Sequence, residues 1–264
     1  MERPLVVELG SAIVALIEPH RGFERAFNRW WERDHGLVGG ALAPWTIGSA
    51  RWVATRELKA LRHPRATRLF APVGAGSFLS AFWIQQGELE TQQQWVNVQM
   101  ERAAAEWRGF AERDHLCTHR YAYCGGVFRD ADGVPAELAL ERRYPGVVAA
   151  WFERAPDVPL VGLRRWILER HCSEHLPGSP VAMVLAFELL PKPDYWPAAT
   201  PQPAGLADRL LLLHFLEEDP RACWDAQFAG LGAAVASARQ GELLLAAPFI
   251  PTIPGTDRYL DELW

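Results

Sequence analysis

Short apolar runs alternate with longer amphipathic stretches along this chain and predict a regular order of strands and helices. Four runs in the first half predict strands, at residues 11–18, 47–56, 76–87 and 119–128. A helix is predicted over residues 21–35, between the first two strands. A second helix is predicted before the last strand, where apolar residues from Val96 to Phe110 recur at steps of three and four. The first half therefore has the predicted order strand, helix, strand, strand, helix, strand.

The second half repeats part of this pattern. Residues 47–56 (IGSARWVATR) and 161–170 (VGLRRWILER) share Gly, Arg, Trp and Arg at one spacing, 114 residues apart, so 161–170 is also predicted to be a strand. Residues 209–216 and 242–250 predict two further strands, separated by a helix that begins with Asp219 as N-cap and Pro220 at its first position.

Two shorter stretches complete the predicted second unit. Residues 136–144 are interpreted as its first strand, and residues 146–155 as its first helix. Residues 171–205 have no counterpart in the first half and are predicted to be an insertion, whose proline-rich end at 191–203 forms an irregular flap or linker.

This order predicts an α+β protein built from two ferredoxin-like βαββαβ repeats, residues 1–130 and 131–264. Each repeat covers one face of its sheet with helices and leaves the other face apolar. Packing the two sheets together would form a dimeric-α+β-barrel-type fold, here within one chain.

Composition narrows the function classes. The 264 residues are 49% hydrophobic and 22% charged, as in ordinary globular proteins, and the net charge of -5 does not favour binding to nucleic acid or an anionic membrane. No segment reaches the roughly 18 uncharged apolar residues of a membrane span, and the N-terminal stretch does not have the pattern of a signal peptide. Four cysteines without CxxC spacing are typical of a reduced, cytoplasmic protein.

One helix end and the following strand carry a recognisable motif. The sequence RWWERDH contains Trp31 and His35, and IGSARW contains Arg51 and Trp52. This order resembles the EthD-like branch of the dimeric α+β barrel superfamily. The resemblance implies a cofactor-independent enzyme with a cavity between sheet and helices, in which His, Tyr, Asp or Arg supplies acid-base chemistry.

His35 is the first candidate for acid-base catalysis. It is predicted to lie one helical turn beyond Trp31, with Gly36 adopting the left-handed turn that ends the helix. Near the negative helix end the imidazole would be an acid, and in an apolar cavity it would be a base. The alternative is a structural histidine that caps the helix over packed tryptophans.

The strand HRYAYC supplies the next candidates. Alternation places His119, Tyr121 and Tyr123 on one face, where they could line a cavity and hold an enol or phenol. Buried tyrosines that hydrogen-bond within the sheet are the alternative. Arg51 is predicted to orient an oxyanion, although a surface ion pair is equally consistent with its position.

Twelve tryptophans provide apolar surface for a flat ligand. The predicted walls of the substrate site are Trp30, Trp31, Trp52 and Trp83, with Tyr123. The second half has no histidine in WFERAPD to match His35, so one cavity is expected, in the first half.

Two clusters, DHLCTH (114–119) and HCSEH (171–175), leave metal binding open, but neither has firm zinc spacing, and no metal or cofactor is predicted. The predicted function is a cyclase or dehydratase-type lyase that transfers protons on a hydrophobic, aromatic or polyketide-like small molecule. A cofactor-free monooxygenase and a non-catalytic binding protein are the alternatives, and a monomer and a homodimer both remain open.

Overall fold

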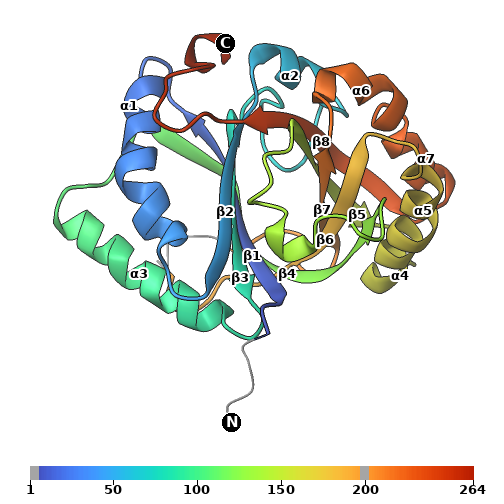
Figure 1. Ribbon diagram of the computed structural model, residues 1–264, viewed down its shortest axis with the longest axis horizontal. Helices are drawn as coiled ribbons and strands as arrows, with labels where there is room; N and C mark the ends of the chain where they lie inside the picture. The colour runs from blue at the N-terminus through green and yellow to red at the C-terminus, as the bar shows by residue number, and fades with distance from the viewer. Residues whose placement is uncertain (1–5, 197–201) are drawn as a thin grey trace.

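Eight antiparallel strands close into a barrel, with helices packed on its outside (Figure 1). The computed structural model describes residues 6–196 and 202–264. The strands are β1 (Leu9–Pro19), β2 (Thr46–Val53), β3 (Phe78–Gln85), β4 (Arg113–Phe128), β5 (Gly146–Arg154), β6 (Val181–Leu189), β7 (Arg209–Leu216) and β8 (Gly241–Pro251). The α-helices are α1 (Glu24–Trp30), α2 (Arg56–Leu61), α3 (Leu89–Ala105), α4 (Leu160–Arg165), α5 (Ser173–His175), α6 (Pro220–Gln227) and α7 (Leu231–Ser237).

The strand order shows how the barrel closes. Around the barrel the strands run β1-β3-β2-β8-β5-β7-β6-β4, and β4 pairs with β1. Each half therefore has the ferredoxin-like order, β4-β1-β3-β2 and β8-β5-β7-β6. The halves join where β2 pairs with β8 and β4 pairs with β6, which confirms the predicted barrel within one chain.

Three predicted elements of the second half are wrong. Residues 161–170 form α4 and a following π-helical turn (Trp166–Cys172) instead of a strand, and residues 146–155 form strand β5 instead of a helix. The predicted strand at 136–144 is a short 3₁₀ turn (Ala136–Leu138) followed by a loop. The strand that corresponds to β2 is β6, which lies inside the segment 171–205 that was predicted to be an insertion. The repeat boundary at residue 130 stays a prediction.

Side chains fill the interior of the barrel. Alternate residues of β7 belong to two clusters: Leu211, Leu213 and Phe215 face the interior, whereas Leu210 and Leu212 pack under α4 and α6. Trp83 is fully buried in the interior cluster. Because this interior is packed, space for a ligand must be sought outside the barrel, between sheet and helices.

A buried histidine on the outer face of the second-half sheet makes stability depend on pH. His214 hydrogen-bonds to the Val148 carbonyl at 3.2 Å, and burial lowers its pKa from 6.5 to about 4. The unfolded chain therefore binds a proton between these pH values that the folded chain does not, so the free energy of unfolding falls as pH decreases from about 6.5 to 4. We expect this group to contribute about 3 kcal/mol of that loss.

Urea unfolding of the His214→Gln variant between pH 4 and 7 checks this expectation, because the pH slope should flatten. Phe228 packs edge-to-face on the His214 ring, with centroids 5.4 Å apart, so Phe228→Leu is a matched control. It should lower stability at every pH and keep the slope. An unchanged slope in His214→Gln would contradict the assignment.

Candidate active site

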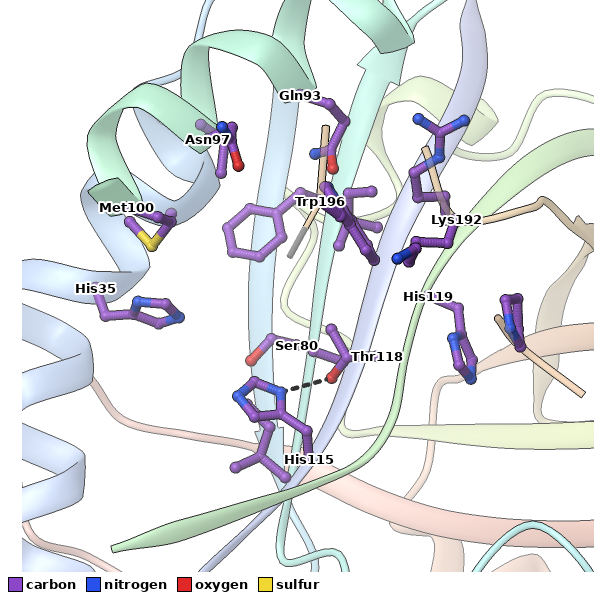
Figure 2. A pocket seen from close by; sticks show the side chains of 18 of the residues that line it. His35, Ser80, Gln93, Asn97, Met100, His115, Thr118, His119, Lys192 and Trp196 are labelled. Atoms are coloured by element: carbon purple, nitrogen blue, oxygen red, sulfur yellow. Dashed lines mark hydrogen bonds between the residues drawn. The ribbon is translucent and has the colours of Figure 1, made fainter. Parts of the chain in front are cut away.

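A cavity of about 800 Å³ lies between the outer face of the first-half sheet and the helices that cover it (Figure 2). Its apolar floor comes from β1 and β3, including Ile13, Ala15 and Phe82. Helix α3 supplies one wall, and the segment after β6 closes the cavity from the other side. The wall residues from α3 are Gln93, Val96, Asn97, Met100, Glu101 and Ala104.

His35 faces this cavity from a π-helical turn (Trp31–His35) that directly continues α1. A π turn brings residues five apart onto one side, and the ring of His35 stacks on Trp30 with centroids 4.3 Å apart and planes at 15°. The ring also lies against Gly39, where a Cβ atom would stand 3.4 Å from Cε1 of His35. The imidazole is therefore held in place by ring and backbone contacts.

The helix does not end at Gly36 as predicted. Gly36 has right-handed helical angles (φ -62°, ψ -32°), and a second π turn continues to Ala41. His35 thus lies inside a helical segment, without the exposed carbonyls of a helix end next to it. The helix-end mechanism for protonating His35 is absent.

The surroundings of His35 keep it uncharged. Burial is the largest cause that lowers its pKa from 6.5 to about 3, and the positive charge of Arg113 is the next. Neither ring nitrogen hydrogen-bonds to another residue in the described part of the chain. His35 therefore borders an apolar cavity as a neutral imidazole, and the lone pair of its unprotonated ring nitrogen accepts no hydrogen bond from the described residues.

A second imidazole, His115, lines the same cavity from β4, and Figure 2 shows both rings facing the same space. Arg113 Nε donates to His115 Nε2 at 3.1 Å, and a guanidinium can only donate, so Nε2 is the acceptor. Nδ1 then carries the proton and donates to Thr118 Oγ1 at 2.9 Å. Both nitrogens of His115 are occupied, which leaves His35 as the available base of the pair.

A segment of the second half forms the flap over the cavity. We use "the flap" for residues 190–196, of which Leu190, Pro191, Lys192, Tyr195 and Trp196 line the cavity. The Tyr195 hydroxyl donates to Glu90 Oε2 on α3 at 2.8 Å, and Arg120 Nη1 on β4 lies 2.8 Å from Glu90 Oε1. These contacts attach the flap to α3 and β4. The irregular segment predicted at 191–203 is thus part of the site, although residues 197–201 lie outside the described residues.

The structure brings only some of the predicted site residues to this cavity. His35 and Trp31 line it, and His119 borders it on the side of Lys192, apart from His35 and His115 (Figure 2). Trp30 supports His35 from behind and donates its Nε1 hydrogen to the Arg108 carbonyl at 2.7 Å.

Two predicted tyrosines and one tryptophan face the interior of the barrel instead. Tyr121 is buried beside Trp151, whose Nε1 donates to its hydroxyl at 3.4 Å, and desolvation raises the pKa of Tyr121. Tyr123 packs on Phe187, and Trp83 donates to the Ala136 carbonyl at 3.0 Å. The predicted alternation placed Tyr121 and Tyr123 on one face of β4, which is right, but the face that these two share is the packed one. Tyr121, Tyr123 and Trp83 are structural here.

Arg51 and Trp52 border a separate pocket of about 370 Å³, on the other side of the π turn. Arg51 is buried, and its guanidinium lies over the rings of Phe78 (4.0 Å) and Trp31 (4.5 Å). Nη1 donates to Asn28 Oδ1 at 2.6 Å, while Nε and Nη2 have no partner among the described residues. Arg51 is therefore not the surface ion pair that the sequence left open, and it acts on the main cavity only at a distance, through its charge.

The second half does contain a counterpart of His35. Trp166 and His171 are five residues apart in a π turn, and their rings stack with planes at 19°, as do those of Trp30 and His35. The two pairs are 136 residues apart. The sequence comparison missed this pair because it aligned the wrong strand. Leu163, Ile167 and other apolar side chains pack below the helices of the second half, and a pocket of about 480 Å³ lies beside α4 and the end of β4.

The histidine and cysteine clusters do not converge. Among residues 6–196 and 202–264, no group of three or more His, Cys, Asp or Glu side chains could hold a metal ion. The rings of His171 and His175 lie 4.3 Å apart and are tilted by 32°, and Nδ1 of His175 is hydrogen-bonded to the His171 carbonyl at 2.7 Å. In DHLCTH, Cys117 faces the interior of the barrel and His115 faces the cavity.

Comparisons with known proteins identify the fold. No family model and no curated protein matches the chain. A solved structure of a protein described as anthrone oxidase-like has a TM-score of 0.56 at 8% identity, covering 95% of both chains. A protein from Fusobacterium nucleatum subsp. nucleatum, described as a candidate monooxygenase, has a TM-score of 0.51 at 9% identity, covering 94% of this chain and 95% of that chain.

This chain has the dimeric α+β barrel fold. Since a fold hosts many reactions, likeness at such low identity does not transfer an activity. No helix in the described part of the chain is long and apolar enough to cross a membrane.

Proposed function

We propose that this dimeric α+β barrel protein is an enzyme that removes a proton from a hydrophobic, weakly acidic small molecule, with His35 as the general base. One observation carries the proposal: an uncharged imidazole with no hydrogen-bond partner among the described residues borders a large cavity with an apolar floor. Pockets of this size and polarity are typical of small-molecule sites. The EthD-like branch, a cytoplasmic location and the lack of a cofactor remain predictions, and the choice between a monomer and a homodimer stays open.

The charges near His35 suit an anionic intermediate. Arg113 and Arg51 both lower the pKa of His35, so they favour the neutral imidazole. The same positive charges stabilise an enolate, phenolate or carbanion formed beside the ring. A substrate with an acidic C–H or O–H group would therefore form its anion more readily here than without these charges, and the anion in contact with the ring would in turn stabilise the protonated imidazole of His35.

Two reactions can follow proton removal. In a cyclase or dehydratase-type lyase, the carbanion closes a ring or expels water without a further reactant. In a cofactor-free monooxygenase, the carbanion reacts with dioxygen, so that a CH₂ group and O₂ give a C=O group and water. The names of the two similar structures make the second reaction the alternative to test.

Anthrone is a suitable first probe, because its CH₂ group is acidic and its three fused rings are apolar. We expect the purified protein to accelerate exchange of the CH₂ hydrogens with deuterium, followed by NMR under nitrogen. An oxygen electrode then separates the reactions, since the lyase consumes no dioxygen and the monooxygenase consumes one molecule per anthrone. Saturable binding of anthrone without any exchange would instead support the binding protein and overturn the proposal.

A further inference from the structure

The two ends of the main cavity differ in charge. Arg120 and Lys192 line it at the flap, and His35 and His115 line it at the other end. Figure 2 shows Lys192 and Trp196 on the side away from His35. The acidic residue among the described lining residues is Glu101, which follows Met100 at the His35 end of α3. The arginine and the lysine among the described lining residues thus both lie at the flap end, where Arg120 also pairs with Glu90.

The guanidinium of Arg120 has an N–H group that is not used in a hydrogen bond with the described residues. It is 94% buried, with a relative exposure of 6%. Its described contacts, to Glu90 and to the Tyr195 hydroxyl, both use Nη1. Nε is buried and has no acceptor in the described part of the chain. A buried guanidinium nitrogen without an acceptor is costly unless a ligand supplies one.

Lys192 adds a second positive charge, and lysine is a rare residue type in this sequence. Apart from Lys59, it is the only lysine among the 264 residues, in a chain that otherwise uses arginine. Its backbone N–H donates to Gln202 Oε1 at 2.9 Å, which fixes this part of the chain at the cavity. A lysine ammonium is a compact charge that suits one carboxylate oxygen.

The distance between the two ends limits the shape of the ligand. Gln93 and Met100 are seven residues apart on α3 and both line the cavity. At 1.5 Å per residue, this separation corresponds to about 10 Å along the helix. A ligand that reaches both ends therefore needs a rigid apolar body of about two or three rings in length.

We propose that the substrate is an apolar aromatic acid, whose carboxylate binds at Lys192 and Arg120 while the carbon or oxygen that loses its proton lies at His35. Only the placement of the reacting atom at His35 rests on the proposed function. The carboxylate end is a property of the cavity and is tested by binding alone, so its failure is distinguishable from a failure of the catalytic proposal.

Isothermal titration calorimetry with biphenyl-4-carboxylate and biphenyl-4-carboxamide tests the proposal, because the two probes differ in charge and hardly in shape. We expect the carboxylate to bind about tenfold more tightly or better in the natural protein. The Lys192→Met variant should lose this preference while it still binds the amide, and Lys192→Arg should keep most of it. Arg25→Met, on the exposed side of α1, should change neither constant.

Other outcomes have definite meanings. Acetate alone should not bind at the same concentrations, since the apolar body contributes most of the affinity, and tight acetate binding would indicate a separate site for small anions and overturn the proposal. Equal affinity for acid and amide would show that Lys192 and Arg120 serve only to hold the flap. Arg120→Met also removes the contact with Glu90, so the comparison of Lys192→Met with Lys192→Arg, which keeps the charge, decides.

Discussion

Replacing His35 with glutamine is expected to lower kcat/KM for the natural substrate by about 10²- to 10⁴-fold, the usual contribution of a general base. Glutamine fills a similar space but cannot accept a proton at neutral pH. Because neither ring nitrogen of His35 bonds to a described residue, the substitution breaks no internal hydrogen bond and the fold should keep its stability. Deuterium exchange at the probe's CH₂ group, measured beside thermal unfolding, checks both statements.

The pH profile distinguishes this base from an ordinary histidine. With a pKa of about 3, His35 stays deprotonated throughout the neutral and mildly acidic range. The rate of proton removal should therefore not fall between about pH 8 and 5, whereas a histidine with pKa near 6.5 would lose activity there. His115→Gln is the matched control: it changes the other imidazole of the cavity, whose nitrogens are already bonded, and should reduce the rate far less. An equal loss of rate in His35→Gln and His115→Gln would contradict the assignment of His35 as the general base.

The barrel could be predicted from the sequence because the strand-helix order of the first half is explicit, and residues 209–216 and 242–250 repeat its end. Two errors in the second half have physical reasons. The run GVVAAWF of β5 is buried on both faces, so it has no alternation that would distinguish it from a helix. In 160–172 the buried residues Leu163, Ile167 and Leu168 follow helical spacing, a signal that the shared Gly-x-x-Arg-Trp motif concealed.

The site could be predicted only in part. The motif located His35 and Trp31, but the side of the sheet that each β4 residue faces depends on which face the helices cover. The sequence gives the alternation of Tyr121 and Tyr123 and leaves that choice open. His115 was considered only as a metal ligand, and the flap residues Lys192 and Tyr195 reach the cavity through contacts between the two halves. Contacts between segments far apart in the chain leave no pattern in the local sequence.

The largest expected effect on stability lies outside the cavity, in a buried charge cluster around Glu18. Glu18 accepts hydrogen bonds from the backbone and hydroxyl of Ser77, and Lys59 Nζ lies 3.6 Å from its Oε1. Arg62 is fully buried nearby, and the charge of Glu18 supports the protonated forms of both Lys59 and Arg62. Replacing Glu18 with glutamine leaves these cations without their counter-charge, and we expect a loss of about 3–5 kcal/mol in the free energy of unfolding.

A double-mutant cycle shows whether charge is the cause. Burial lowers the pKa of Lys59 to about 8, so above that pH the lysine becomes neutral and the penalty of Glu18→Gln should shrink. Adding Lys59→Met to Glu18→Gln removes one orphaned charge and should recover part of the loss at pH 7, measured by urea unfolding. If the two losses simply add, Glu18 stabilises the chain through the hydrogen bonds that it accepts from Gly76 and Ser77, and not through its charge. In that case the two cations are tolerated for a reason other than pairing, namely the carbonyl groups of Val73 and Leu263 that accept their hydrogen bonds.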